Sequence, residues 1–136
     1  MKLFSILFCA VLLTVLSWKP SYAQDSIKVI SKISEKSIDD NYIKGVNSKN
    51  MGLRVSSMYY LGERQSSAAV IPLMKELHMD KVPEARIMAA LSLFKIGDKR
   101  GIYAIEQAAQ DDKNEQVRNM CKVFSEMAKA NKNSGH

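Results

Sequence analysis

The sequence predicts an all-α protein, built as a short α-solenoid of about two and a half helix-turn-helix repeats and preceded by a signal peptide. Three observations predict it. The chain matches itself at a fixed period, and within each period apolar residues recur at spacings of three and four, as one face of an α-helix requires. The chain also starts with an apolar run of the kind that directs export.

The start of the chain is typical of a signal peptide. Lys2 gives it a positive tip, an apolar run extends from Leu3 to Trp18, and the small-residue site Ser21-Tyr22-Ala23 follows. We predict cleavage after Ala23, which makes residues 1–23 the signal peptide. The run has 16 residues, fewer than the roughly 20 that cross a bilayer, and this favours cleavage over an uncleaved anchor. We therefore expect a periplasmic or secreted protein with no membrane span after cleavage.

Composition and charge narrow the functional class. The chain is 46% hydrophobic and 25% charged, as in ordinary globular proteins. Without Lys2 and Lys19 the formal charge falls from +6 to +4, which is a smaller positive charge than a nucleic-acid-binding protein usually carries.

Cys121 is the only cysteine after the leader, so the domain must rest on an apolar core. We interpret Cys121 as a small buried residue, with a reactive thiol or an intermolecular disulfide bridge as the alternative.

The 32-residue repeat brings residues of the same kind to the same position in successive units. Charged, capping and apolar residues all follow this register, which is therefore a property of the whole unit. The superposed positions are Lys49 with Lys81 and Lys113, Arg54 with Arg86 and Arg118, Asp80 with Asp112, Ser66 with Asp98, and Leu61 with Leu93.

The second unit shows its two predicted helices most clearly. The apolar residues between Ile87 and Phe94 fall on one face of the first helix. Gly97 follows where a left-handed residue ends a helix, and Asp98 offers a carboxylate to cap the next one. Pro83 suits the first turn, where its missing N–H costs nothing.

Other helix boundaries are less regular. Pro72 lies some six residues beyond a cap expected at Ser66, so that helix is kinked or starts later. The stretch Asp112-Lys-Asn-Glu115 resembles a capping box for the last helix, and Ser37-Ile-Asp-Asp40 resembles one that opens a short early helix. The resulting domains are an N-terminal helical half repeat at 24–48, the repeats at 49–130 and a disordered tail at 131–136.

An aspartate stands six residues before an arginine in two units, as Asp80 with Arg86 and Asp112 with Arg118, and small residues follow the first arginine. This pattern, over about residues 49–127, resembles HEAT repeats, in particular the short bacterial type also found in phycobilin lyases. The resemblance implies that Asp80, Arg86, Asp112 and Arg118 form a structural ladder between repeats. Because Ser48 stands where the first unit would carry its aspartate, we expect the ladder to end at Arg86.

No catalytic residue and no metal site is predicted. His78 and His136 are the only histidines, and neither they nor Cys121 has the spacing of a zinc site or a nucleophile–base pair. The resemblance places the second helix of each unit on a concave face where partners dock, with solvated surface as the alternative interpretation. The candidate binding residues on this face are Ile71, Met74, Lys75, His78, Tyr103, Glu106, Gln107 and Gln110.

The predicted function is an exported, non-enzymatic binding or scaffold module that contacts a protein partner and uses no cofactor. A first alternative, implied by the resemblance to phycobilin lyases, is an accessory protein that binds a small ligand, although the leader argues against it. A second is nucleic-acid binding, which would require a continuous basic stripe. A basic cluster of Arg64, Lys99 and Arg100 could instead meet an acidic partner or an anionic surface, with plain solvation as the alternative interpretation. A short stack also leaves its ends uncovered, which favours self-association.

Overall fold

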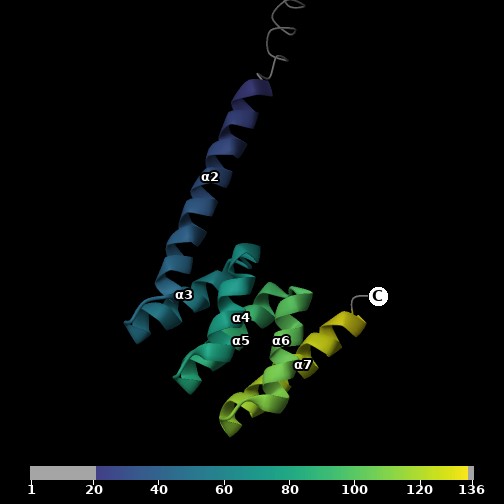
Figure 1. The fold of residues 1–136 in the computed structure, drawn as a ribbon. Coiled ribbons are helices and arrows are strands. Elements are labelled where there is room, and N and C mark those ends of the chain that lie inside the picture. Colours follow the sequence, from purple (N-terminus) through teal and green to yellow (C-terminus); the bar gives the residue numbers. More distant parts are fainter. Residues whose placement is uncertain (1–20, 135–136) are drawn as a thin grey trace, which may run out of the picture. The chain divides into compact units, whose positions relative to one another are not determined.

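The computed structural model describes residues 21–134 and is all-helical, with no strand among them (Figure 1). Contacts divide the chain into two units, one that ends at Glu35 and one that begins at Lys36. No helix of the described part is long and apolar enough to cross a membrane. The helices are α2 (Ser21–Val46), α3 (Met51–Glu63), the 3-10 turn η1 (Ser67–Ala69), α4 (Val70–Met79), α5 (Pro83–Ile96), α6 (Lys99–Asp111) and α7 (Glu115–Ser134).

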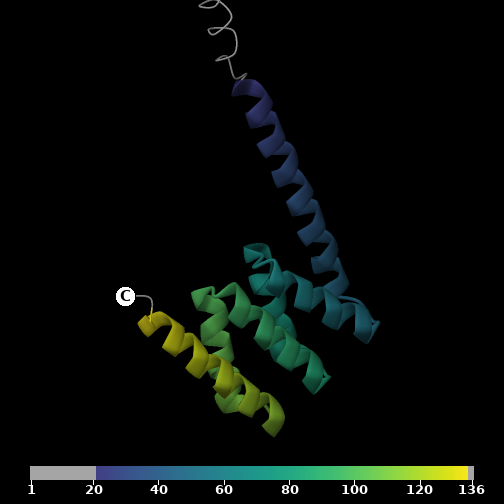
Figure 2. The ribbon, with the colours of Figure 1, turned by 180° about the vertical axis from the view of Figure 1, so that it is seen from behind.

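The second unit is built from two layers of helices. Helix α5 packs against both α3 and α7 in one layer, and α4 packs against α6 in the other. Figure 2 shows α3, α5 and α7 side by side. These three helices begin at Met51, Pro83 and Glu115, which superpose in the repeat register, so each helix occupies the same place in its own repeat.

The N-terminal helix differs from the prediction. Helix α2 runs without a break through Ser37, where a new helix was expected to start. Its last turns belong to the second unit, where Val46 is fully buried and the Tyr42 ring stacks on Tyr60 with centroids 5.3 Å apart. The apolar run of the predicted signal peptide lies outside the described residues, so the leader stays a prediction.

Three of the predicted boundaries are confirmed. Gly97 has φ 72°, in the left-handed region that glycine adopts without a steric cost, and it ends α5. Asp98 accepts the Arg100 N–H at 2.8 Å and so caps α6. Pro83 is the first residue of α5, where no helical partner exists for its missing donor.

Three other boundaries differ from the prediction. The expected capping bond from Ser66 is absent, because its hydroxyl donates to Asp39 at 2.5 Å, and α4 starts only at Val70, which places Pro72 safely in its first turn. At α7 the cap is Asn114, whose side chain accepts the Val117 N–H at 3.1 Å, in place of Asp112. The tail expected at 131–136 is helical as far as Ser134.

The core runs along the boundary between the two layers. Its fully buried members come from all helices of the second unit. At Gly62 on α3, a Cβ would lie 2.8 Å from the Ser92 Cα of α5, so only glycine fits this crossing. The buried apolar residues are Val46, Met58, Leu61, Ala69, Val70, Leu73, Leu77, Ala85, Ala89, Ala90, Leu93, Ile105, Val117, Cys121 and Phe124.

Cys121 is part of this core, and we expect its thiol to be unreactive. Burial, with the nearby Asp112 charge, raises the pKa of Cys121 to about 11, so almost no thiolate forms at neutral pH. In a Cys9→Ser variant, dithionitrobenzoate at pH 8 should label Cys121 only after urea unfolds the protein. Rapid labelling of the native protein would show that this part of the core opens readily.

Candidate binding groove

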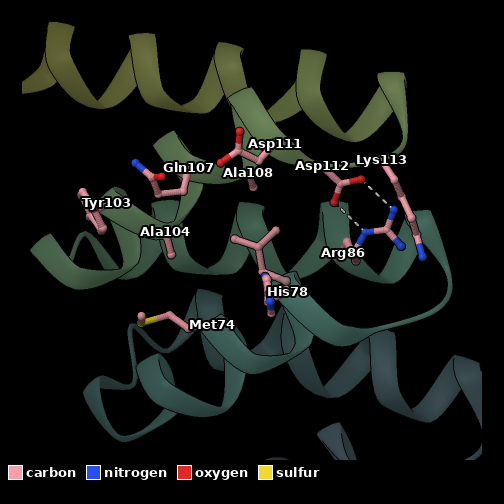
Figure 3. A pocket seen from close by; sticks show the side chains of 11 residues that line it. Met74, His78, Arg86, Tyr103, Ala104, Gln107, Ala108, Asp111, Asp112 and Lys113 are labelled. Carbon is pink, nitrogen blue, oxygen red and sulfur yellow. Dashed lines mark hydrogen bonds and ion pairs between the residues drawn. The ribbon is translucent and has the colours of Figure 1, made fainter.

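A groove of about 560 Å³ opens between α4 and α6, and we call it the α4–α6 groove (Figure 3). Its floor is apolar and its rim carries an aromatic ring, an imidazole, an amide and charged groups. Among ligand-binding cavities this volume is of ordinary size. The residues that line it are Met74, Leu77, His78, Arg86, Tyr103, Ala104, Gln107, Ala108, Asp111, Asp112 and Lys113.

Small side chains keep this groove open. Ala104 and Ala108 stand one helical turn apart on α6 and form its floor together with Leu77 of α4. At the equivalent positions of the preceding repeat, α4 carries the larger Pro72 and Glu76. The groove is therefore a feature of this one pair of helices, and it arises because α6 has no bulk at two adjacent turns.

The rim combines exposed apolar surface with polar groups that have no partner inside the protein. Tyr103 is 61% exposed, although a buried tyrosine ring would stabilise the fold far more. Within the described part of the chain, no hydrogen bond or ion pair engages the side chains of His78, Gln107 or Asp111. An exposed aromatic beside unengaged donors and acceptors suits contact with another molecule.

The structure brings together four of the eight predicted binding residues: Met74, His78, Tyr103 and Gln107 all line the groove. Glu106 and Gln110 face a second hollow of about 490 Å³ between α6 and α7, which Gln107 also borders. Ile71 is 58% exposed, Lys75 is also exposed, and neither lines the groove or the second hollow.

The groove floor and its charged end were not predicted from the sequence. Ala104 and Ala108 carry no functional group that would have drawn attention to them. They are four residues apart, beside Tyr103 and Gln107, so the two small side chains leave space on the same face of the helix. Asp111 and Lys113 were missed because Asp111 is the last residue of α6 and Lys113 lies in the turn after it. No group of three or more metal-binding side chains occurs in residues that the structure describes.

Arg86 borders one end of the groove and is the most deeply buried charged residue of the second unit, at 1% exposure. Its Nε and Nη2 donate to the two carboxylate oxygens of Asp112, both at 2.8 Å. Its Nη1 donates to the Asp80 carbonyl at 2.8 Å. This fork joins the turn before α5 to the turn before α7 and holds successive units at a fixed spacing.

The same contacts recur one unit earlier. Arg54 donates from Nε and Nη2 to Asp80 at 2.7 and 3.3 Å, and from Nη1 to the Ser48 carbonyl at 3.0 Å. The expectation that the ladder ends at Arg86 is therefore wrong. Arg54 and Arg86 each pair with the aspartate of the following unit, so the first unit needs no aspartate of its own. Arg118 keeps only the carbonyl contact, to Asp112 at 2.7 Å.

The ladder carboxylates stay ionised despite their surroundings. Burial alone would raise the pKa of Asp112, but the Arg86 guanidinium and the Asn114 N–H outweigh it, and the pKa lies below its ordinary value. The pKa of Asp80 is lowered for the same reasons, by the Val82 N–H and Arg54 against burial. Both pairs are therefore charged at neutral pH.

The predicted basic cluster is largely neutralised. Arg64 pairs with Asp39 at 2.6 Å, and Arg100 pairs with Asp98 at 2.9 Å. The bonds from Arg100 lower the pKa of Asp98 to about 2, which keeps this pair charged at any physiological pH. Two of the three expected positive charges are thus matched within the chain, and the cluster offers little free charge to a partner.

Comparison with known proteins gives little information about function. No protein-family model matches the chain. The chain is similar to an "Uncharacterized protein in gldA 3'region" from Geobacillus stearothermophilus, with 26% identity over 113 residues. The match covers 82% of this chain and 52% of the relative, so the chain spans about half the length of the relative it matches.

Proposed function

We propose that this protein is an exported, non-enzymatic module of HEAT-like repeats that binds a protein partner in the α4–α6 groove. The groove itself is the observation that carries the proposal. It presents an exposed tyrosine and a half-buried methionine over an apolar floor, beside polar groups with no internal partner. Aromatic and methionine side chains of this kind supply much of the binding energy in protein interfaces.

The frame around the groove supports a binding role. Arg86 and Asp112 close one end with two charge-assisted hydrogen bonds, so that end is preorganised and needs no rearrangement when a partner binds.

Two observations support the repeat interpretation. Three helices begin at equivalent positions of successive repeats, and the ladder joins the turns that precede them. The apolar leader with its small-residue cleavage site supports export.

A small ligand is the second candidate, because the groove volume of about 560 Å³ is that of a drug-sized site. A small molecule and a peptide side chain would both rest on Ala104 and Ala108. Native mass spectrometry of the purified protein separates the two, since a retained small ligand adds a defined mass that denaturation removes.

We expect two substitutions to weaken partner binding strongly without unfolding the protein. Ala108→Leu fills the floor of the groove, and Met74→Glu places a charge on its apolar wall. Each should weaken capture of a partner from the native envelope fraction by about 30-fold, the size of a hot-spot loss. Quantitative mass spectrometry of the captured proteins measures this, and circular dichroism checks the fold.

Matched controls are available outside the groove. Met79→Glu makes the same change at a 65% exposed methionine of α4 that does not line the groove, and Ala68→Leu adds the same bulk at an exposed alanine. Both should capture the partner as the unaltered protein does. Equal capture by the groove variants and the controls would show that the partner binds elsewhere.

A further inference from the structure

The same turn is built three times in the second unit, before α3, α5 and α7. The side chain of its first residue accepts the backbone N–H two residues later, and an arginine six residues later donates to the carbonyl of that first residue. Backbone angles at the first residue agree closely, with φ −64° and ψ 135° at Asp80 and φ −62° and ψ 136° at Asp112. The side-chain bonds are Ser48 with Asn50 at 3.1 Å, Asp80 with Val82 at 2.9 Å and Asp112 with Asn114 at 2.8 Å.

The second residue of every such turn is a lysine, and we call Lys49, Lys81 and Lys113 the lysine row. All three are exposed, and none forms a hydrogen bond or ion pair with another residue of the described chain. The carboxylates beside them are engaged, because Asp80 and Asp112 are held by Arg54 and Arg86. The lysines of the row therefore make no direct ion pair, although the Lys113 charge helps to lower the pKa of the neighbouring Asp112.

Folding explains the other repeated residues of these turns but not the lysines. The first residue and the arginine brace the turn, so their recurrence follows from the structure. An exposed position with no contact tolerates almost any polar residue. Three residues further on, where the helix begins, the same register holds Gly52, Glu84 and Gln116. A lysine retained in all three units points to a function outside the fold.

The geometry of the stack determines which partner the row can meet. Packed helices lie about 8–10 Å apart, and α3, α5 and α7 are neighbours, so successive lysines stand roughly 10 Å apart on equivalent rigid turns. A peptide in the extended polyproline II conformation advances about 3.1 Å per residue with three residues per turn, so every third side chain lies on the same face. Side chains three residues apart on such a peptide therefore match the spacing of the row.

We propose that the lysine row binds an extended acidic segment of the protein partner, with carboxylates at every third residue. The inference rests on the proposed function, because Lys113 also lines the α4–α6 groove and makes the two surfaces continuous. The row orients the segment, and the groove takes an apolar side chain of the same partner.

A synthetic peptide tests the row separately from the groove. Fluorescence anisotropy at low salt measures binding of a fluorescein-labelled Glu-Ser-Gly repeat peptide to the full chain, against a peptide of equal composition with contiguous glutamates. We expect the spaced peptide to bind more tightly, and Lys81→Glu to weaken it by about two- to fivefold for each ion pair lost.

Lys99→Glu is the matched control. It makes the same charge change at an exposed lysine that follows α5, whereas Lys81 precedes it, so net charge is equal in the two variants. An equal loss in both variants, or no preference for the spaced peptide, overturns the proposal. So does binding of the row to anionic vesicles or an oligonucleotide with no binding of the peptide.

The groove variant Ala108→Leu separates this inference from the proposed function. The probe peptide carries no apolar side chain, so this variant should bind it normally even though it has lost the native partner. If Ala108→Leu keeps the native partner while Lys81→Glu loses the peptide, the groove proposal fails and the lysine row stands.

Discussion

Replacement of Arg86 by methionine is expected to lower the free energy of unfolding by about 3–5 kcal/mol, the cost of breaking a buried ion pair. Arg86 is 1% exposed and makes three hydrogen bonds at 2.8 Å, two of which reach Asp112 of the next unit. Methionine fills much of the space but leaves the Asp112 carboxylate and the Asp80 carbonyl without their donors. Urea denaturation followed by circular dichroism measures the change.

Two further variants make this result specific. Arg118→Met removes an arginine that keeps only a carbonyl contact, so it should cost about 1 kcal/mol. The double variant Arg86→Met with Asp112→Leu should recover part of the stability, because no unpaired charge remains buried. If Arg86→Met and Arg118→Met cost the same, the ladder does not hold the units together.

Substitution of Gly62 by alanine should destabilise the protein by about 1–3 kcal/mol, although alanine is the better helix former. The new Cβ would lie 2.8 Å from the Ser92 Cα, a backbone atom that cannot move alone. The Ser92 hydroxyl also donates to the Met58 carbonyl at 2.7 Å, so separating α3 from α5 would weaken that bond. Thermal unfolding monitored by circular dichroism measures the loss.

Gly52→Ala is the control for this substitution. Gly52 lies in the same helix, is exposed, and its added Cβ would meet only the Asn50 side-chain oxygen at 3.3 Å. A side-chain tip can yield, so we expect a change within about 1 kcal/mol of zero. A Gly62→Ala protein as stable as Gly52→Ala would mean that the two helices are less tightly packed than this crossing indicates.

The candidate site was only partly predictable. Met74 and Tyr103 were found because they fall on the exposed face of their helices, which helical periodicity alone determines. The distance between α4 and α6 decides that a groove lies between them and that Ile71 is outside it. Such an approach depends on side-chain volumes in both helices at once, and a pattern along one helix does not contain it.

The sequence by itself determined the helical class, the repeat register, and the helix ends at Gly97 and Asp98, because each depends on short-range geometry within one segment. Only the tertiary structure decided the partners of the polar side chains. The Ser66 hydroxyl binds Asp39, and Arg54 pairs with the aspartate of the next unit, 26 residues away. A polar group can bond to any partner that folding brings near it, including residues far away in the sequence. Its partner is therefore known only from the three-dimensional contacts.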